Sequence, residues 1–164
     1  MGRNDIVKVD GSIDYDYLGE SIDKLGSQMA EITTVSITKY KSLALNVGTD
    51  SEDWAPALQA ANDYISNNFT SGILLIPYNI QCKQTFNWDC TKVILKGNHT
   101  NIIFNIDNLS AYAIKTNPSL FITENNLWCI GLNITGVDRK CQGILFQHDS
   151  IGICNLVFMG CNIK

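Results

Sequence analysis

Five carboxylates in the second half of the chain are the residues from which an acid–base site could be built. Together with the basic residues near them, they are Asp89, Asp107, Glu124, Asp138, Arg139, His148 and Asp149. Cleavage of a glycosidic bond needs two carboxylates at a defined separation, or a base beside a group that neutralises charge. No two of these carboxylates occupy matching positions of a repeat, and turn residues flank each of them. We therefore interpret them as solvated turn residues and predict no catalytic residue here.

The neighbours His148 and Asp149 make a poor catalytic dyad, because adjacent residues of a strand point to opposite faces of a sheet. The sequence also contains no phosphate-binding loop, dinucleotide fingerprint, G-x-S-x-G elbow or H-E-x-x-H motif. These motifs are the usual signs of nucleotide, hydrolase and zinc chemistry. We predict that the chain binds no cofactor.

The cysteines are the other residues that could bind a metal ion. They form no C-x-x-C motif, and only His99 and His148 accompany them as imidazole ligands. This spacing argues against a metal centre, and we predict none. Without a secretory signal, we expect buried thiols in a reducing cytoplasm rather than a disulfide framework. The residues concerned are Cys82, Cys90, Cys129, Cys141, Cys154 and Cys161.

Several aromatic side chains could form a platform for sugars, because a pyranose face packs well on an aromatic ring. The candidates are Tyr78, Trp88, Tyr112 and Trp128. The same residue types more often pack in a core or an interface. The sequence alone does not distinguish these two roles.

A helix followed by a strand, within residues 49–79, is the element that organises the chain. We predict Asp53 as the N-cap of this helix, because Pro56 then falls in the first turn, where its missing N–H costs nothing. An apolar stripe at helical spacing should face the core and cap the domain. It consists of Trp54, Leu58, Ala61 and Ile65, while the residues predicted to face away are Gln59, Asn62 and Asp63. Residues 73–76, before Pro77, are predicted as a buried strand.

This stretch resembles the entry element of pectate-lyase-like right-handed β-helix proteins. The resemblance is carried by Thr49-Asp50, by the A-L-Q-A-A run at 57–61 and by G-I-L-L-I-P at 72–77. In that family a T-D-D-x-x-A-[IL]-Q-x-A helix caps the solenoid, and a G-x-[VIL]-x-[VIL]-P strand opens its first turn. The chain departs from the family at 46–48, which is N-V-G where G-D-G is usual, and at 77–79, where P-Y-N replaces the start of P-x-G-x-Y. The alternative is an ordinary strand and helix of an α/β domain.

An apolar seam in the N-terminal arm predicts a helix that needs a packing partner. Its residues recur in steps of 3 and 4, the a/d pattern of a coiled coil, over little more than two heptads. Gly19 and Gly26 weaken this helix in isolation. The helix either packs on its own domain or bundles with copies of itself, and its polar other faces favour self-association. The seam consists of Tyr15, Leu18, Ile22, Leu25, Met29 and Ile32.

Short apolar runs separated by Gly, Asn and Asp turns follow Pro77 and predict stacked strands. The pattern L-x-[IF]-x-G occurs at 132–136 and again at 156–160, a spacing of 24 residues. Such a period is typical of a solenoid, although a β-sandwich gives similar strand spacing. Residues 160–164 end within the pattern, so we expect a longer polypeptide. The runs lie at 93–95, 102–104, 120–122, 130–134, 144–146 and 153–158.

The composition argues against polyanionic partners. The net charge is -4 and the isoelectric point is near 5.0, so we expect neither nucleic acid nor an anionic membrane as a partner. The first ten residues lack the apolar core of a secretory signal, and no apolar run approaches the roughly 20 residues of a membrane span. We predict no membrane insertion.

The predicted fold class is mainly β, with a helical N-terminal arm, a capping α-helix and the start of a right-handed parallel β-helix. We assign residues 1–34 to the arm with its oligomerising helix and residues 35–48 to a linker. The capping helix and first β-helix turns then occupy residues 49–164, and the β-helix is expected to continue beyond them.

The resemblance implies a functional setting, because this entry element is common in bacteriophage tailspikes and appendages. It implies a homotrimer in the virion, assembled in the host cytoplasm, whose arm docks to collar or tail proteins. Residues further downstream would bind, and are expected to degrade, a host surface polymer such as capsular polysaccharide or teichoic acid. The alternatives are a monomeric polysaccharide-degrading enzyme, hydrolase or lyase, and a scaffold without activity.

Overall fold

The computed structural model describes residues 33–116, 126–137, 140–145 and 155–163. The chain divides into two units, Met1–Ile32 and Thr33–Lys164. Every residue of the predicted seam, from Tyr15 to Ile32, belongs to the first unit and lies outside the described residues. All described residues therefore belong to the second unit.

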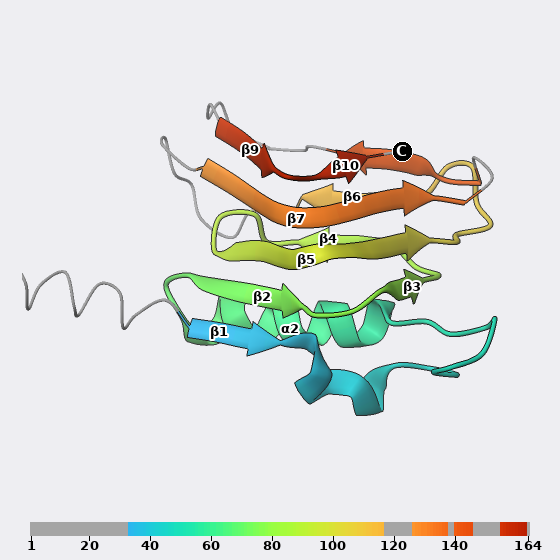
Figure 1. Cartoon of the computed structure of the whole chain (residues 1–164), viewed down its shortest axis with the longest axis horizontal. Helices are drawn as coiled ribbons and strands as arrows, with labels where there is room; N and C mark the ends of the chain where they lie inside the picture. Colours follow the sequence, from blue (N-terminus) through green and yellow to red (C-terminus); the bar gives the residue numbers. More distant parts are fainter. Residues whose placement is uncertain (1–32, 117–125, 138–139, 146–154, 164) are drawn as a thin grey trace, which may run out of the picture. The chain divides into compact units, whose positions relative to one another are not determined.

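The second unit is mixed α/β and is built mostly from parallel strands (Figure 1). Its helices are the 3₁₀ helix η1 (Ile37–Leu43) and the α-helix α2 (Ala55–Asn68). Its strands are β1 (Thr33–Ser36), β2 (Gly72–Ile76), β3 (Ile80–Cys82), β4 (Phe86–Trp88), β5 (Val93–Phe104), β6 (Tyr112–Thr116), β7 (Asn126–Gly136), β8 (Gln142–Leu145), β9 (Asn155–Met159) and β10 (Asn162–Ile163).

The strands form two sheets, and the chain passes repeatedly from one to the other (Figure 1). The large sheet has the order β1-β2-β5-β7-β10, with β3 also paired to β5 and β9 to β7, and the small sheet has the order β4-β6-β8. All these strand pairs are parallel. Two parallel neighbouring strands must be joined by a crossover connection. From β4 onward, each crossover between strands of the large sheet contains one strand of the small sheet.

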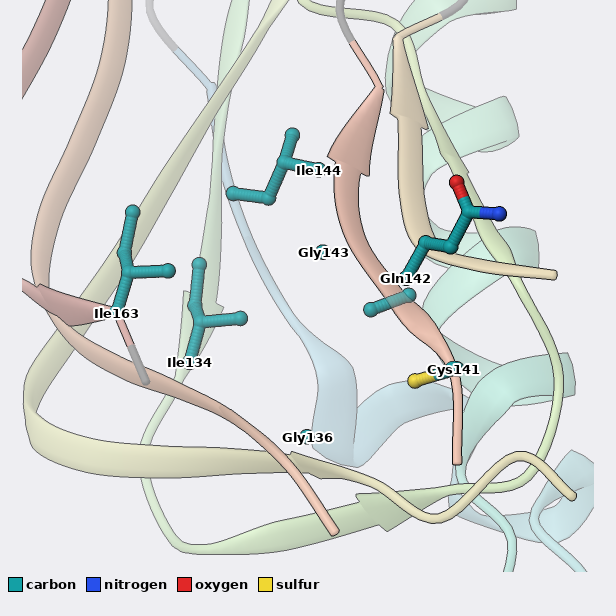
Figure 2. Close-up of a pocket in the computed structure, with 8 residues that line it drawn as sticks. Ile134, Gly136, Cys141, Gln142, Gly143, Ile144 and Ile163 are labelled. Carbon is teal, nitrogen blue, oxygen red and sulfur yellow. The ribbon is translucent and has the colours of Figure 1, made fainter. Parts of the chain in front are cut away.

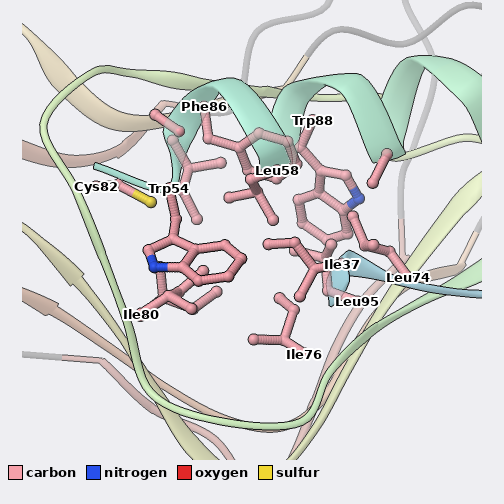
Figure 3. Packing of buried hydrophobic residues seen from close by; sticks show 14 of the residues in the cluster. Ile37, Trp54, Leu58, Leu74, Ile76, Ile80, Cys82, Phe86, Trp88 and Leu95 are labelled. Atoms are coloured by element: carbon pink, nitrogen blue, oxygen red, sulfur yellow. The ribbon is translucent and has the colours of Figure 1, made fainter. Parts of the chain in front are cut away.

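The core lies between the two sheets and beneath α2. The register of the strands aligns side chains of the same type in columns. Ile80 pairs with Ile102, Ile102 with Ile134, and Ile134 with Ile163. The first three isoleucines are buried. Figure 3 shows how the cap closes over this core: Leu58 from α2 packs with large side chains that include Ile37, Leu74, Phe86 and Trp88.

Helix α2 begins one residue later than predicted. Trp54, not Asp53, holds the N-cap position, with φ -93° and ψ 0°, and Pro56 falls in the first turn. The Asp53 carboxylate still serves the helix start, because its Oδ1 accepts from the backbone N–H of Ala55 at 3.0 Å. All four residues of the predicted apolar stripe, Trp54, Leu58, Ala61 and Ile65, are buried.

Asp53 also fastens α2 to the strands that follow it. Its Oδ1 accepts from the backbone N–H of Lys83 at 2.9 Å, and its Oδ2 accepts from Nε2 of Gln84 at 3.0 Å. Its backbone exchanges two 2.9 Å hydrogen bonds with Leu45. The side chain is 4% exposed, so these bonds satisfy a buried carboxylate that would otherwise be costly.

Asn62 faces the core rather than solvent, which corrects the prediction that it points away. Its side chain is buried, and its Oδ1 accepts from the backbone N–H of Asp89 at 3.0 Å. Gln59, also predicted to face away, exchanges two hydrogen bonds with the backbone of Asn87. The polar side of α2 therefore binds the chain around β4, and a periodicity argument cannot find such a contact because it counts only apolar residues.

Residues 35–48, assigned above to a linker, include ordered elements that pack on the core. Strand β1 ends at Ser36, and its register with β2 places Thr33 opposite Gly72. Val35 and Ile37 are both buried. Ile37 starts η1, where the Ser36 hydroxyl accepts from the Thr38 N–H and caps the turn.

The repeat spacing of 24 residues predicted from L-x-[IF]-x-G is not the register of the sheet. Leu156 pairs with Leu127, and Phe158 pairs with Cys129, so the offset between β7 and β9 is 29 residues. β10 keeps the same offset, with Asn162 opposite Asn133. The dipeptide Asn-Ile occupies matching register positions at 79–80, 101–102, 133–134 and 162–163, and it occurs once more at 105–106.

In the three later passes of the large sheet, a left-handed residue precedes this dipeptide. His99, Gly131 and Gly160 have φ of 55°, 63° and 62°. Each lies two residues ahead of Asn101, Asn133 or Asn162. The register between β5 and β7 shifts at the same place, between Lys96 and Thr100. A left-handed residue redirects a strand, and glycine adopts that conformation without steric cost.

We predict that Gly131→Ala destabilises the protein more than Gly160→Ala. Both changes place a Cβ on a left-handed residue, which costs about 1–2 kcal/mol. The Cβ at 131 would also meet the carbonyl oxygen of Gly97 at 2.8 Å, whereas the Cβ at 160 meets nothing within 4 Å. The clash should add about 1–3 kcal/mol. Urea unfolding followed by circular dichroism measures both losses, and equal losses would contradict the close approach at 131.

We also predict that Asp53→Ala lowers the free energy of unfolding by about 3 kcal/mol, because three donors lose their acceptor, one at the start of α2 and two after β3. The matched control is Asp50→Ala, an exposed carboxylate in the preceding turn, whose loss should cost less than about 0.5 kcal/mol. Chemical denaturation of both variants measures the difference. Similar midpoints for the two variants would show that the Asp53 network contributes no stability.

Candidate functional site

Two of the five candidate carboxylates lie within the described residues, and they have different environments. Asp89 is 3% exposed, and its Oδ1 accepts from the Thr91 hydroxyl at 2.6 Å and from the Thr91 N–H at 3.2 Å. The interpretation of Asp89 as a solvated turn residue is therefore wrong: it is a buried structural residue between β4 and β5. Asp107 is exposed. The remaining candidates, Glu124, Asp138, Arg139, His148 and Asp149, lie outside the described residues.

The aromatic candidates do not form one platform in the described structure. Trp88 is 1% exposed and donates from Nε1 to the Val93 carbonyl at 2.7 Å, so it belongs to the core. Tyr78 packs edge-on against Trp54, with ring centroids 5.3 Å apart. Burial and then the Glu52 carboxylate raise the pKa of Tyr78, which keeps its phenol neutral. The side chain of Trp128 is outside the described set.

Tyr112 is the aromatic candidate with a cation beside it. Nζ of Lys115 lies 5.7 Å from the centre of its ring, within the range of a cation–π contact. Tyr112 is half-buried at the start of β6 in the small sheet. A single ring in this setting offers at most one stacking face to a sugar.

An apolar cavity of about 230 Å³ lies beside β7, β8 and β10 (Figure 2). Ile134 and Ile163 line it from the large sheet, and Ile144 from the small sheet. Its polar side chains are Cys141 and Gln142, and Nε2 of Gln142 donates to the Leu109 carbonyl at 3.2 Å. The remaining lining residues are Ala113, Gly136 and Gly143.

This cavity suits an apolar group rather than acid–base chemistry. Among the described residues, no carboxylate, imidazole or amine lines it. It continues the space between the sheets, which in the preceding passes is filled by buried side chains such as Ile102 and Ile114. Beside it, Ile163 is 47% exposed and Met159 is 51% exposed. The chemistry of the cavity is therefore that of a core position that could accept another apolar side chain.

A column of asparagines is the polar feature that our reading of the sequence missed. Asn79, Asn101, Asn133 and Asn162 follow one another across the large sheet, directly beside the isoleucine column. Oδ1 of Asn79 accepts from the backbone N–H of Asn101 at 2.8 Å and from its Nδ2 at 3.0 Å. These bonds tie the Asn79 and Asn101 passes together, whereas Nδ2 of Asn133 donates to the His99 carbonyl at 3.4 Å. The recurring Asn-Ile dipeptide was the available signal.

Searches for metal and membrane sites add two findings. Within the described ranges, no group of three or more His, Cys, Asp or Glu side chains could hold a metal ion. None of the helices described is long and apolar enough to cross a bilayer.

The comparisons with known proteins give no relative for this chain. No protein-family model, no curated protein and no solved structure matches it.

Proposed function

We propose that this chain is the virion-attachment and trimerisation region of a bacteriophage tailspike or collar appendage protein. The arm docks to collar or tail proteins through residues 1–34, and the stacked strands begin a right-handed parallel β-helix. The full-length protein binds and degrades a host surface polymer, either a capsular polysaccharide or a teichoic acid. The particle is assembled in the host cytoplasm.

The observation that carries this proposal is the alternation of the chain between two parallel sheets under a capping helix. Seven of the described strands lie in one sheet and three in the other, and every named strand pair is parallel. A solenoid produces this pairing, because each turn contacts only its neighbours. Helix α2 lies where the T-D and A-L-Q-A-A resemblance expects a cap, ahead of the first long strand pairs.

An adhesive role for this region is favoured over a catalytic one. Asp89 is buried and bound to Thr91, and Asp107 is exposed on a loop. Glycoside hydrolysis needs two carboxyl groups facing one substrate. Within the described residues, Asp89 and Asp107 form no such pair. We propose that the residues that degrade the polymer lie downstream.

We predict that the chain sediments as a trimer and that the double variant Ile22→Asp/Leu25→Asp sediments near the single-chain mass of 18.2 kDa. Two buried charges in each copy would remove the apolar seam on which association depends. The matched control is Asp16→Asn/Asp23→Asn, which changes the same segment outside the seam and should stay trimeric. A monomeric wild-type chain at high concentration would overturn the attachment model and favour the monomeric enzyme.

We predict that the full-length protein releases soluble fragments from purified capsular polysaccharide or teichoic acid. Chromatography of the digest with detection of new reducing ends or unsaturated sugars would distinguish hydrolysis from elimination. This chain alone should release no fragments, because it lacks the downstream residues. A trimeric full-length protein that binds the polymer without releasing product would support the scaffold instead.

A further inference from the structure

We propose that Cys129 and Cys161 form a redox-responsive pair that closes to a disulfide and fastens the β9–β10 segment to β7. Cys129 lies in the middle of β7, and Cys161 lies between β9 and β10. The pair is distinct from the seam and from the polymer-binding residues of the proposed function. The inference rests on the geometry of the two thiols alone.

The two sulfur atoms are already in contact. Sγ of Cys161 lies 3.6 Å from Sγ of Cys129 and 3.1 Å from the Cys129 carbonyl oxygen. The Met159 carbonyl oxygen is 3.5 Å from the same Cys161 sulfur. A disulfide bond is about 2.05 Å long, so the sulfurs need to approach by about 1.5 Å. Gly160 supports this geometry, because its left-handed φ of 62° turns the chain directly ahead of Cys161.

The two thiols differ in solvent exposure, and this difference determines which of them reacts first. Cys129 is fully buried, whereas Cys161 is partly exposed. Burial, followed by the proximity of Cys161, raises the pKa of Cys129, so its thiol stays protonated in the reduced protein. Because the thiolate is the nucleophile, Cys161 is the thiol that meets an oxidant first and Cys129 is the resolving thiol.

The oxidant we assign is a small organic disulfide such as oxidised glutathione. The Cys161 thiolate attacks one glutathione sulfur, which forms a mixed disulfide and releases the first glutathione thiolate. Sγ of Cys129 then attacks Sγ of Cys161 as the Cys161–glutathione bond breaks, and the proton of Cys129 passes to the departing glutathione sulfur, which leaves as the second glutathione thiol. Two protein thiols are oxidised to one disulfide, and one glutathione disulfide is reduced to two thiols.

The bond would stabilise the most weakly held part of the described large sheet. β10 contributes only two paired residues, Asn162 and Ile163, and both are exposed. The disulfide closes the loop between 129 and 161, which removes conformational freedom from the unfolded chain. If the proposed function holds, the disulfide forms late. The thiols stay reduced during assembly in the cytoplasm, and they oxidise after the particle leaves the cell.

The test incubates the folded full chain with oxidised or reduced glutathione, blocks the remaining thiols with N-ethylmaleimide and digests the protein with chymotrypsin. Cleavage after Trp128, Leu132 and Phe158 separates residues 129–132 and 159–164 from the other cysteines. We expect the oxidised sample to contain these two peptides as one disulfide-linked species. We also expect its melting temperature to be about 5–10 °C higher than that of the reduced sample.

Two variants control the experiment. Cys161→Ser should fold, because the site is partly exposed, and should lose both the linked peptide and the rise in melting temperature. Cys141→Ser, which removes another half-buried thiol, should keep both. Absence of the linked peptide from the oxidised wild-type protein would overturn the proposal, as would an unchanged melting temperature with the link present. Neither result would change the outcome of the sedimentation and polymer assays. The disulfide proposal and the proposed function can therefore be rejected independently of each other.

Discussion

The parallel register of the large sheet is the constraint on which the rest of the described structure depends. A parallel strand cannot return directly to its neighbour, so the chain crosses to the small sheet and encloses a core between the two. The same register stacks Ile80, Ile102 and Ile134 in one column and sets asparagines beside them. Each pass buries its apolar face against the next, so the stability of any strand depends on its neighbours.

Two local features keep this register in place. At the cap, the Asp53 carboxylate binds both the start of α2 and the chain after β3, so helix and strands cannot shift independently. At the bends, left-handed His99, Gly131 and Gly160 redirect the three later passes at equivalent positions. The side chains on either side of a bend then return to the same columns. This alignment also brings Cys129 and Cys161 together, although 32 residues separate them in sequence.

The structure changes the interpretation of several residues that had seemed candidates for function. Trp88 and Asp89 are adjacent, and both are buried where β4 ends. The indole fills the core, and the carboxylate holds Thr91, so neither is open to a polymer. The apolar cavity beside Ile134 and Ile163 likewise resembles unfilled core more than an enzyme site. In the described part of the chain, these residues therefore have structural roles.

The sequence by itself determined the helix at 55–68 and the strand at 72–76, because Pro56, the apolar stripe and Pro77 act over a few residues. Strands β3, β4 and β6 were missed, since none of them contains consecutive Val, Ile, Leu or Phe residues. The register, the burial of Asn62 and Asp89 and the meeting of Cys129 with Cys161 were decided by tertiary structure. Each depends on which distant strands pair, and the number of residues in the intervening turns sets that pairing.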